Sequence, residues 1–400
     1  MNVSKLNRYL VGLCLFVGYT LFALSWKAGD LFISNVGYDD NDLSSLIAVL
    51  NIVKVAVNFL IGVFTAKFIA EKTFLNNSQL FILGCLTVGA SMFALPMNES
   101  FYYIAACRAV LGFGGALILF TMNPLVASIF PENELPVVNG LNSSAFNVGI
   151  ALMLTLASVM ASNPSLVTTF VAIVAISVAA LFFASNRNSV TTMKSRLESN
   201  KPAMLQTNDN QEQFGITDGL KSGFNWLFAL TFTGIMSFYY VAFTFLDGAT
   251  VKYLMYAGIV GNFAGIAGAK ALPHIVVARL ASFVSVVLAV SFMFTLGSEL
   301  SPWIAGALGF AMMFSLPSYV TLGFSQPNST PKKVGITFMM FWVLSDLIAT
   351  FILKAYATLA SAPSTESTAT LFILAVAACY PIGCLFIKGS PKPALQMAEA

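Results

Sequence analysis

The chain has 400 residues, of which 58% are hydrophobic and only 9% are charged, and its formal net charge is +3 at pH 7. A soluble domain carries about 25% charged residues, so this composition excludes a protein whose surface meets mainly water. The small net charge gives no reason to expect a nucleic-acid partner. We therefore expect an integral membrane protein that is surrounded by membrane lipids.

Twelve apolar stretches are long enough to cross a bilayer, which takes about 20 mainly apolar residues per helix. The clearest pair lies within 135–186, which contains no Asp, Glu, Lys or Arg and is interrupted only by Ser162-Asn163-Pro164. The sequence thus predicts an all-α integral membrane protein with twelve transmembrane helices. The predicted helices are approximately 9–35, 43–70, 79–97, 101–130, 136–161, 165–185, 224–246, 253–271, 276–297, 301–324, 334–360 and 368–387.

A long polar segment, 186–223, divides the predicted helices into six before it and six after it. It is rich in Ser, Asn, Gln and Lys and has almost no apolar periodicity, which is typical of a flexible linker. We expect an N-terminal six-helix bundle at 1–185, a cytoplasmic linker at 186–223, a C-terminal six-helix bundle at 224–388 and a cytoplasmic tail at 389–400.

The basic residues indicate the orientation, because lysine and arginine collect on the cytoplasmic side of a membrane. If the N-terminus is inside, the internal segments hold fifteen of the 20 basic residues, whereas the external segments hold acidic residues such as Asp39 and Glu299. This pattern predicts a multi-pass protein of a bacterial-type inner (plasma) membrane with both termini in the cytoplasm.

The fourth predicted helix reads Arg108-Ala-Val-Leu-Gly112-Phe-Gly114-Gly115. Together with the six-plus-six arrangement and the basic central loop, this motif resembles the major facilitator superfamily, and the resemblance covers essentially the whole chain. It implies two pseudo-symmetric bundles that transport a solute by alternating access, in a protein that functions as a monomer.

Two positions depart from that family's patterns. The loop after the second helix keeps Gly62 and Lys67 but has Ala66 where the family has an acidic residue. The fifth helix reads Asn139-Gly-Leu-Asn142-Ser-Ser-Ala-Phe-Asn147 and lacks the Gly-Pro signature of drug and proton antiporters. The first departure argues against the usual charge-paired cytoplasmic gate, and the second disfavours drug efflux.

Basic residues inside the predicted helices are candidates for binding an anion, because a charge near the bilayer centre costs about 3 kcal/mol or more without a partner or a wet cavity. Lys54 lies mid-helix in a polar stripe with Asn51 and Asn58. We predict that Lys54, Asn58 and Arg108 contact the substrate. A cluster that only fixes helix packing, or an arginine that only ties helices together, remains the alternative.

Two buried acids are candidates for proton coupling, since burial and nearby cations move the proton occupancy of a carboxylate in opposite directions. Asp30 lies three residues after Lys27, a spacing that allows the two to pair on one helix face. Asp346 lies two turns before Lys354. We predict proton-coupling roles for Asp346 and Asp30, with Lys354 and Lys27 as their charge partners; static ion pairs are the alternative.

Neutral polar residues in the predicted helices complete the candidate site. Asn147, Tyr239, Tyr240 and Asn262 can orient a solute through hydrogen bonds at a modest desolvation cost. Packing roles account for such residues equally well.

The sequence shows no reactive constellation of an enzyme. His274 is the only histidine, and no HExxH, GxSxG or Walker-type loop is present. We expect no enzymatic activity, no cofactor and no metal site, and transport driven by a gradient.

The main hypothesis is proton-coupled symport of a small, anionic organic solute. Alternatives are proton-coupled efflux of hydrophobic or cationic compounds, and a transporter-like receptor that moves nothing.

Overall fold

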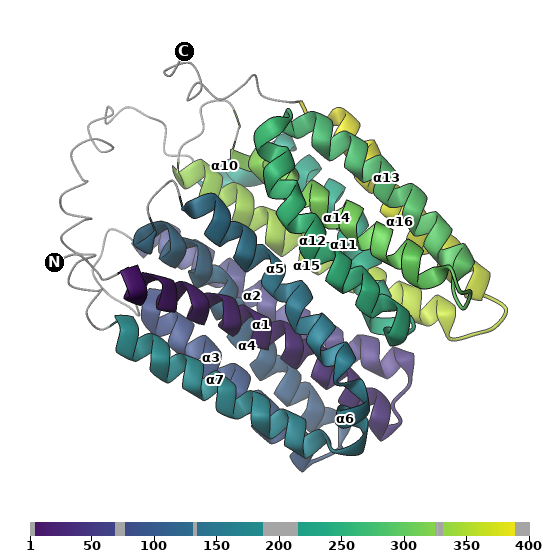
Figure 1. Cartoon of the computed structure of the whole chain (residues 1–400), viewed down its shortest axis with the longest axis horizontal. Helices are drawn as coiled ribbons and strands as arrows, with labels where there is room; N and C mark the ends of the chain where they lie inside the picture. The colour runs from purple at the N-terminus through teal and green to yellow at the C-terminus, as the bar shows by residue number, and fades with distance from the viewer. Residues whose placement is uncertain are drawn as a thin grey trace.

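The computed structural model describes residues 5–68, 77–130, 134–186, 215–324, 326 and 331–388, and the regular structure in these ranges is entirely helical (Figure 1). Before the linker lie α1 (Lys5–Val36), α2 (Asp40–Phe68), α3 (Asn77–Ala94), the 3-10 turn η1 (Leu95–Met97), α4 (Phe101–Ile129), α5 (Leu135–Thr155), α6 (Ala157–Ser162) and α7 (Pro164–Asn186). After it lie α10 (Ile216–Lys221), α11 (Gly223–Phe245), α12 (Gly248–Ala271), α13 (His274–Thr295), α14 (Ser301–Phe324), α15 (Pro331–Ala360) and α16 (Glu366–Phe386).

Ten of these helices are long and apolar enough to cross a membrane, as judged over the described residues. The predicted all-α membrane fold is therefore confirmed, whereas α5 and α12 fall outside this set of ten. Both are long; α5 carries a run of Asn and Ser side chains, and α12 carries four glycines from Gly258 to Gly268.

Three predicted boundaries need correction. The expected single helix at 136–161 is interrupted at Leu156 and forms α5 and α6. The eighth predicted helix begins earlier than expected, because the Asp247 side chain accepts hydrogen bonds from the N–H groups of Ala249 and Thr250 and caps α12. Within the predicted linker, 216–221 form the short helix α10; 187–214 and the predicted tail at 389–400 lie outside the described residues.

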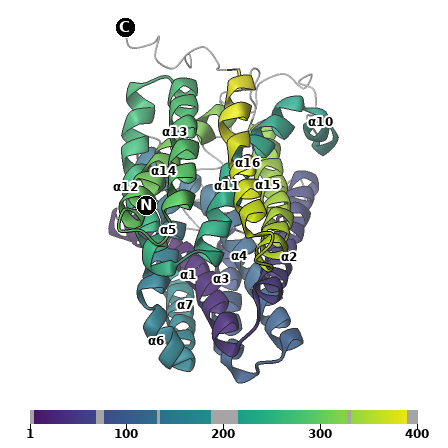
Figure 2. The ribbon, with the colours of Figure 1, turned by 90° about the vertical axis from the view of Figure 1, so that its right-hand side faces the viewer.

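The helices before the linker pack mainly on one another, as do those after it (Figures 1 and 2). We call these sets the N half and the C half. They meet where α2 lies along α15 and where α5 lies along α12. Lys354 Nζ on α15 donates to Asn41 O on α2 at 2.8 Å, far from the linker, and Asn262 Nδ2 on α12 donates to Gly140 O on α5 at 2.7 Å, towards the linker. The halves are therefore in contact near both ends.

Close approach of α4 to its neighbours depends on the glycines of the motif that begins with Arg108. A Cβ atom at Gly112 would collide with the main-chain oxygen of Leu50 on α2, and one at Gly115 would collide with the ring of Phe22 on α1. Small residues of this kind allow membrane helices to pack backbone to backbone. The motif thus holds α4 tightly against the two helices that carry Lys54 and Asp30.

Replacing Gly112 by alanine should destabilise the N half, because the new methyl group meets backbone that cannot move aside. We expect a loss of roughly 1–3 kcal/mol, the usual cost of overpacking, measured by thermal unfolding of the purified protein in detergent. Gly306→Ala is the matched control: its Cβ would meet nothing nearer than Ala257 Cβ at 3.8 Å. Equal stabilities of the two variants would contradict the close-packing argument.

Candidate functional site

Five charged side chains are buried in the part of the chain that the structure describes, and four helices supply them. They are Lys27 and Asp30 on α1, Lys54 on α2, Arg108 on α4 and Asp346 on α15, and none is more than 5% exposed. The sequence had marked all five as candidates. We call them the charged centre.

An ion pair across the interface joins the two halves. Lys54 Nζ on α2 lies 3.0 Å from Asp346 Oδ1 on α15, and both side chains are buried. The hydroxyl of Tyr240 on α11 donates to the same oxygen at 2.8 Å. Asp346 therefore receives two hydrogen bonds at one oxygen, one from each half.

The predicted pairing of Asp346 with Lys354 is wrong. Eight residues on one helix separate the two side chains by about 12 Å along its axis. Lys354 instead donates to the main-chain oxygen of Asn41 and the hydroxyl of Ser45, each at 2.8 Å. It ties α15 to the start of α2, away from the charged centre.

A second ion pair lies wholly within the N half. Arg108 on α4 pairs with Asp30 on α1, and its Nη1 donates to the main-chain oxygen of Trp26 at 2.9 Å. The guanidinium fork can serve a carboxylate and a carbonyl together, and it occupies Asp30 in place of the predicted partner Lys27. Lys27 Nζ crosses to the C half instead and donates to the main-chain oxygen of Phe243 on α11 at 2.5 Å.

Trp26 links these charged groups, and the sequence analysis missed it. Its carbonyl accepts from Arg108, while its ring centroid lies 4.8 Å from Lys54 Nζ, within the range of a cation–π interaction. The Tyr240 ring is 5.4 Å from the Trp26 ring, so aromatic side chains from both halves flank the lysine. A signal was available: tryptophan favours the membrane interface, yet Trp26 lies well inside a predicted span.

The neutral candidates divide into two groups. Tyr240 contacts the charged centre through Asp346, and Tyr239 donates to Asn147 Oδ1 and so links α11 to α5. Asn262 lies towards the linker, where it donates to Gly140 O and to Ser143 Oγ at 2.7 Å each.

Asn58 lies one helical turn beyond Lys54 and is half-buried. Among the described residues, no hydrogen bond joins Asn58 or Asn262 to the charged centre.

Several buried polar atoms around the charged centre have no hydrogen-bond partner in the described protein. They include both amide atoms of Asn51, one turn from Lys54, together with Trp26 Nε1, Asn147 Nδ2 and Asp30 Oδ2. An unsatisfied buried polar group costs about 1–3 kcal/mol. These atoms are hydrogen-bond donors and acceptors near the charged centre that are not used by contacts within the described protein.

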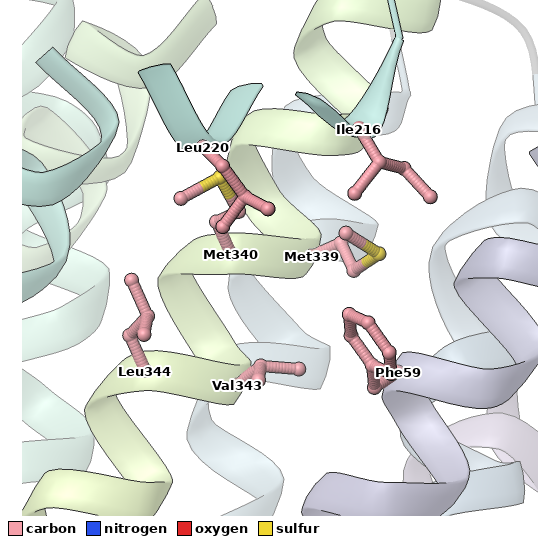
Figure 3. Close-up of a pocket in the computed structure, with 7 residues that line it drawn as sticks. All are labelled: Phe59, Ile216, Leu220, Met339, Met340, Val343 and Leu344. Atoms are coloured by element: carbon pink, nitrogen blue, oxygen red, sulfur yellow. The ribbon is translucent and has the colours of Figure 1, made fainter. Parts of the chain in front are cut away.

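The pocket shown in Figure 3 is a different place with different chemistry. It lies between α2, α10 and α15 and is lined only by apolar side chains: Phe59, Ile216, Leu220, Met339, Met340, Val343 and Leu344. Because it offers no charged or hydrogen-bonding side chain, it does not fit a charged solute. The buried charged side chains of the described residues lie in the charged centre instead.

Comparison with known proteins agrees with this architecture. The family model of the Major Facilitator Superfamily matches residues 9–353, which include every member of the charged centre. A search of curated proteins gives no match.

The buried ion pair of Lys54 with Asp346 and the partly exposed ion pair of Arg8 with Glu134 should contribute very different free energies to stability. Removing one partner of a buried pair costs about 3–5 kcal/mol, because the other charge is left uncompensated. Lys54→Met and Asp346→Asn should each lose that much stability, and the double variant should lose far less than the sum. The measurement is thermal or denaturant unfolding of purified protein in detergent.

The control for this cycle is Arg8, whose Nη2 lies 2.7 Å from Glu134 Oε1 with side chains 17% and 25% exposed. Partly exposed pairs contribute about 0–1 kcal/mol, so Arg8→Met should be mild. Additive losses in the Lys54 and Asp346 double variant would show that the two side chains do not act as a pair.

Proposed function

Because the chain belongs to the Major Facilitator Superfamily, a family of secondary transporters, we propose that it moves a small anionic organic solute by alternating access in symport with protons. In this proposal α5 and α12 complete twelve spans of a bacterial-type inner membrane, both termini are cytoplasmic, and the protein works as a monomer. The N half (1–185) and the C half (224–388) are the two moving bundles, joined by the linker 186–223.

The observation that carries the proposal is the buried ion pair between Lys54 and Asp346. It joins α2 to α15 across the interface, so separating the halves at this level must break it. Protonation of Asp346 would remove the negative charge that holds Lys54. A proton and a conformational change are thereby linked at one carboxylate, which is the minimum requirement for proton coupling.

The ion pair between Arg108 and Asp30 has a different place in this mechanism. Both residues lie in the N half, so the pair can persist while the halves move. It keeps a fixed guanidinium beside the pathway, and its hydrogen bond to Trp26 O holds the segment of α1 that faces Lys54. Arg108 in this role positions the site and adds positive potential for an anion.

The charge arrangement favours an anion over a cationic drug as the solute. Both buried carboxylates are already paired with a basic side chain, one with Lys54 and the other with Arg108. A cation entering the charged centre would have to displace one of these partners and would add to an excess of positive charge. An anion meets basic groups and unpartnered donors instead.

The test uses purified protein in proteoliposomes that enclose a pH-sensitive dye. Addition of a transported organic anion, drawn from a panel of carboxylates and phosphate esters, should acidify the lumen, and an imposed inward proton gradient should drive accumulation. Asp346→Asn should reduce gradient-driven accumulation to the level of empty vesicles, because the proton-binding group is gone.

Asp247→Asn is the matched control for the same exchange. Asp247 caps α12 outside the charged centre, and asparagine also caps helices, so transport should be unchanged. Accumulation that ignores the proton gradient in the natural protein would reject symport with protons. Proton uptake into the lumen coupled to loss of cationic dyes from it would favour the antiport alternative.

A further inference from the structure

The buried charges of the described chain do not balance. Lys27, Lys54 and Arg108 supply three cations, whereas Asp30 and Asp346 supply two carboxylates. Each carboxylate has a close basic partner, and neither partner is Lys27. The unpaired charge is therefore located at one side chain.

The cation without a paired carboxylate is Lys27, and its environment is unusual for a charged side chain. The residue is 5% exposed, and its ammonium group donates to one main-chain oxygen, that of Phe243 on the opposite half. The nearest carboxylate along its helix, that of Asp30, is already held by the guanidinium of Arg108. A buried ammonium without its own counter-charge is costly, and such groups in membranes mark pathways for ions and substrates.

Aromatic rings from both halves pack around Phe243, the residue whose main-chain oxygen accepts from Lys27. The ring of Phe243, whose carbonyl holds the ammonium, lies 6.0 Å from the Trp26 ring and 5.8 Å from the Phe146 ring in edge-to-face arrangements. Tyr240 adds a further ring 5.5 Å from Phe243. Trp26 Nε1 has no partner in the described protein. Rings from both halves, with one free donor, suit a planar molecule that carries an acceptor.

We propose that Lys27 binds the charged group of the solute and that the solute is a monovalent carboxylate with a planar body. This rests on the transport function proposed above, but it moves the principal anion contact from Lys54 and Arg108 to Lys27. With both ion pairs intact, one negative charge neutralises the centre. A second negative charge on the solute would have no cation left to meet.

The first test needs no ligand. If Lys27 awaits an external counter-charge, Lys27→Met removes an uncompensated buried charge, and the unfolding temperature of the purified protein should stay the same or rise. Lys54→Met leaves Asp346 without its ion-pair partner, so the unfolding temperature of this variant should fall. A fall for Lys27→Met as large as that for Lys54→Met would overturn the proposal, because it would make Lys27 a structural residue.

The second test compares probes that differ in one charge. Benzoate and indole-3-acetate are planar monocarboxylates, and phthalate is the planar dicarboxylate matched to benzoate. A ligand that binds the folded state raises its unfolding temperature in proportion to ln(1 + [L]/Kd). We expect protection by a monocarboxylate that exceeds protection by phthalate, and at least about a tenfold higher Kd in Lys27→Met, since a charge-assisted hydrogen bond is worth a factor of ten or more.

Two further variants serve as controls for this comparison. Lys27→Arg keeps the charge and should retain protection, whereas Lys354→Met removes a lysine that hydrogen-bonds Asn41 and Ser45 far from the centre and should leave the Kd unchanged. Protection that survives in Lys27→Met, stronger protection by phthalate, or no protection by either monocarboxylate would overturn the assignment.

Failure of this inference can be told apart from failure of the transport proposal. If proteoliposomes of the natural protein carry organic anions with protons and Lys27→Met does so equally well, only the assignment of Lys27 is wrong. If the natural protein carries no anion at all, the proposed function itself is wrong.

Discussion

The arrangement of the two halves depends on one interaction, the buried ion pair between Lys54 and Asp346. A charged side chain inside a bilayer costs about 3 kcal/mol or more, and a partner at contact distance offsets that cost best where the dielectric constant is low. Each half supplies one of the two charges. Lys54 and Asp346 therefore each find their counter-charge only in the other half, whereas Arg108 and Asp30 pair within the N half.

The rest of the centre divides into contacts that can persist and contacts that must change. The pair of Arg108 and Asp30 and the glycine contacts of α4 lie inside the N half, where they fix the position of α1 against α4. The bonds of Lys54 and Lys27 cross the interface. Strong, closely packed interactions within a half make it move as a unit, and a few crossing hydrogen bonds then determine when it moves.

The sequence predicted the fold well because bilayer thickness and the lack of water impose strong rules on helix length and composition. It also identified all five members of the charged centre, since charge within an apolar span is conspicuous. The sequence did not predict which of these residues form ion pairs with one another. Spacing along one helix suggested Lys27 with Asp30 and Lys354 with Asp346, whereas the actual ion pairs join different helices. Such pairings depend on how helices rotate and approach, which a single sequence does not encode locally.

Other misses have equally specific causes. Trp26 reads as one more apolar residue in a spanning helix, and its role appears only when its ring meets Lys54 and its carbonyl meets Arg108. Asn262 looked equivalent to Asn147 because both are amides in predicted spans. Their depth in the membrane differs: Asn147 accepts a hydrogen bond from Tyr239, next to Tyr240 of the C half, whereas Asn262 donates to Gly140 near the start of α5.

The excess of one buried positive charge bears directly on how tightly a proton and an anion would be coupled. The sum of the five buried charges is one positive. A proton that arrived alone at Asp346 would raise the sum to two and leave Lys54 without its partner, which is the most costly state in a medium that screens charge poorly. A monovalent anion that arrived with the proton would restore the original sum. In the proposed symport, this imbalance therefore opposes passage of a proton without an anion.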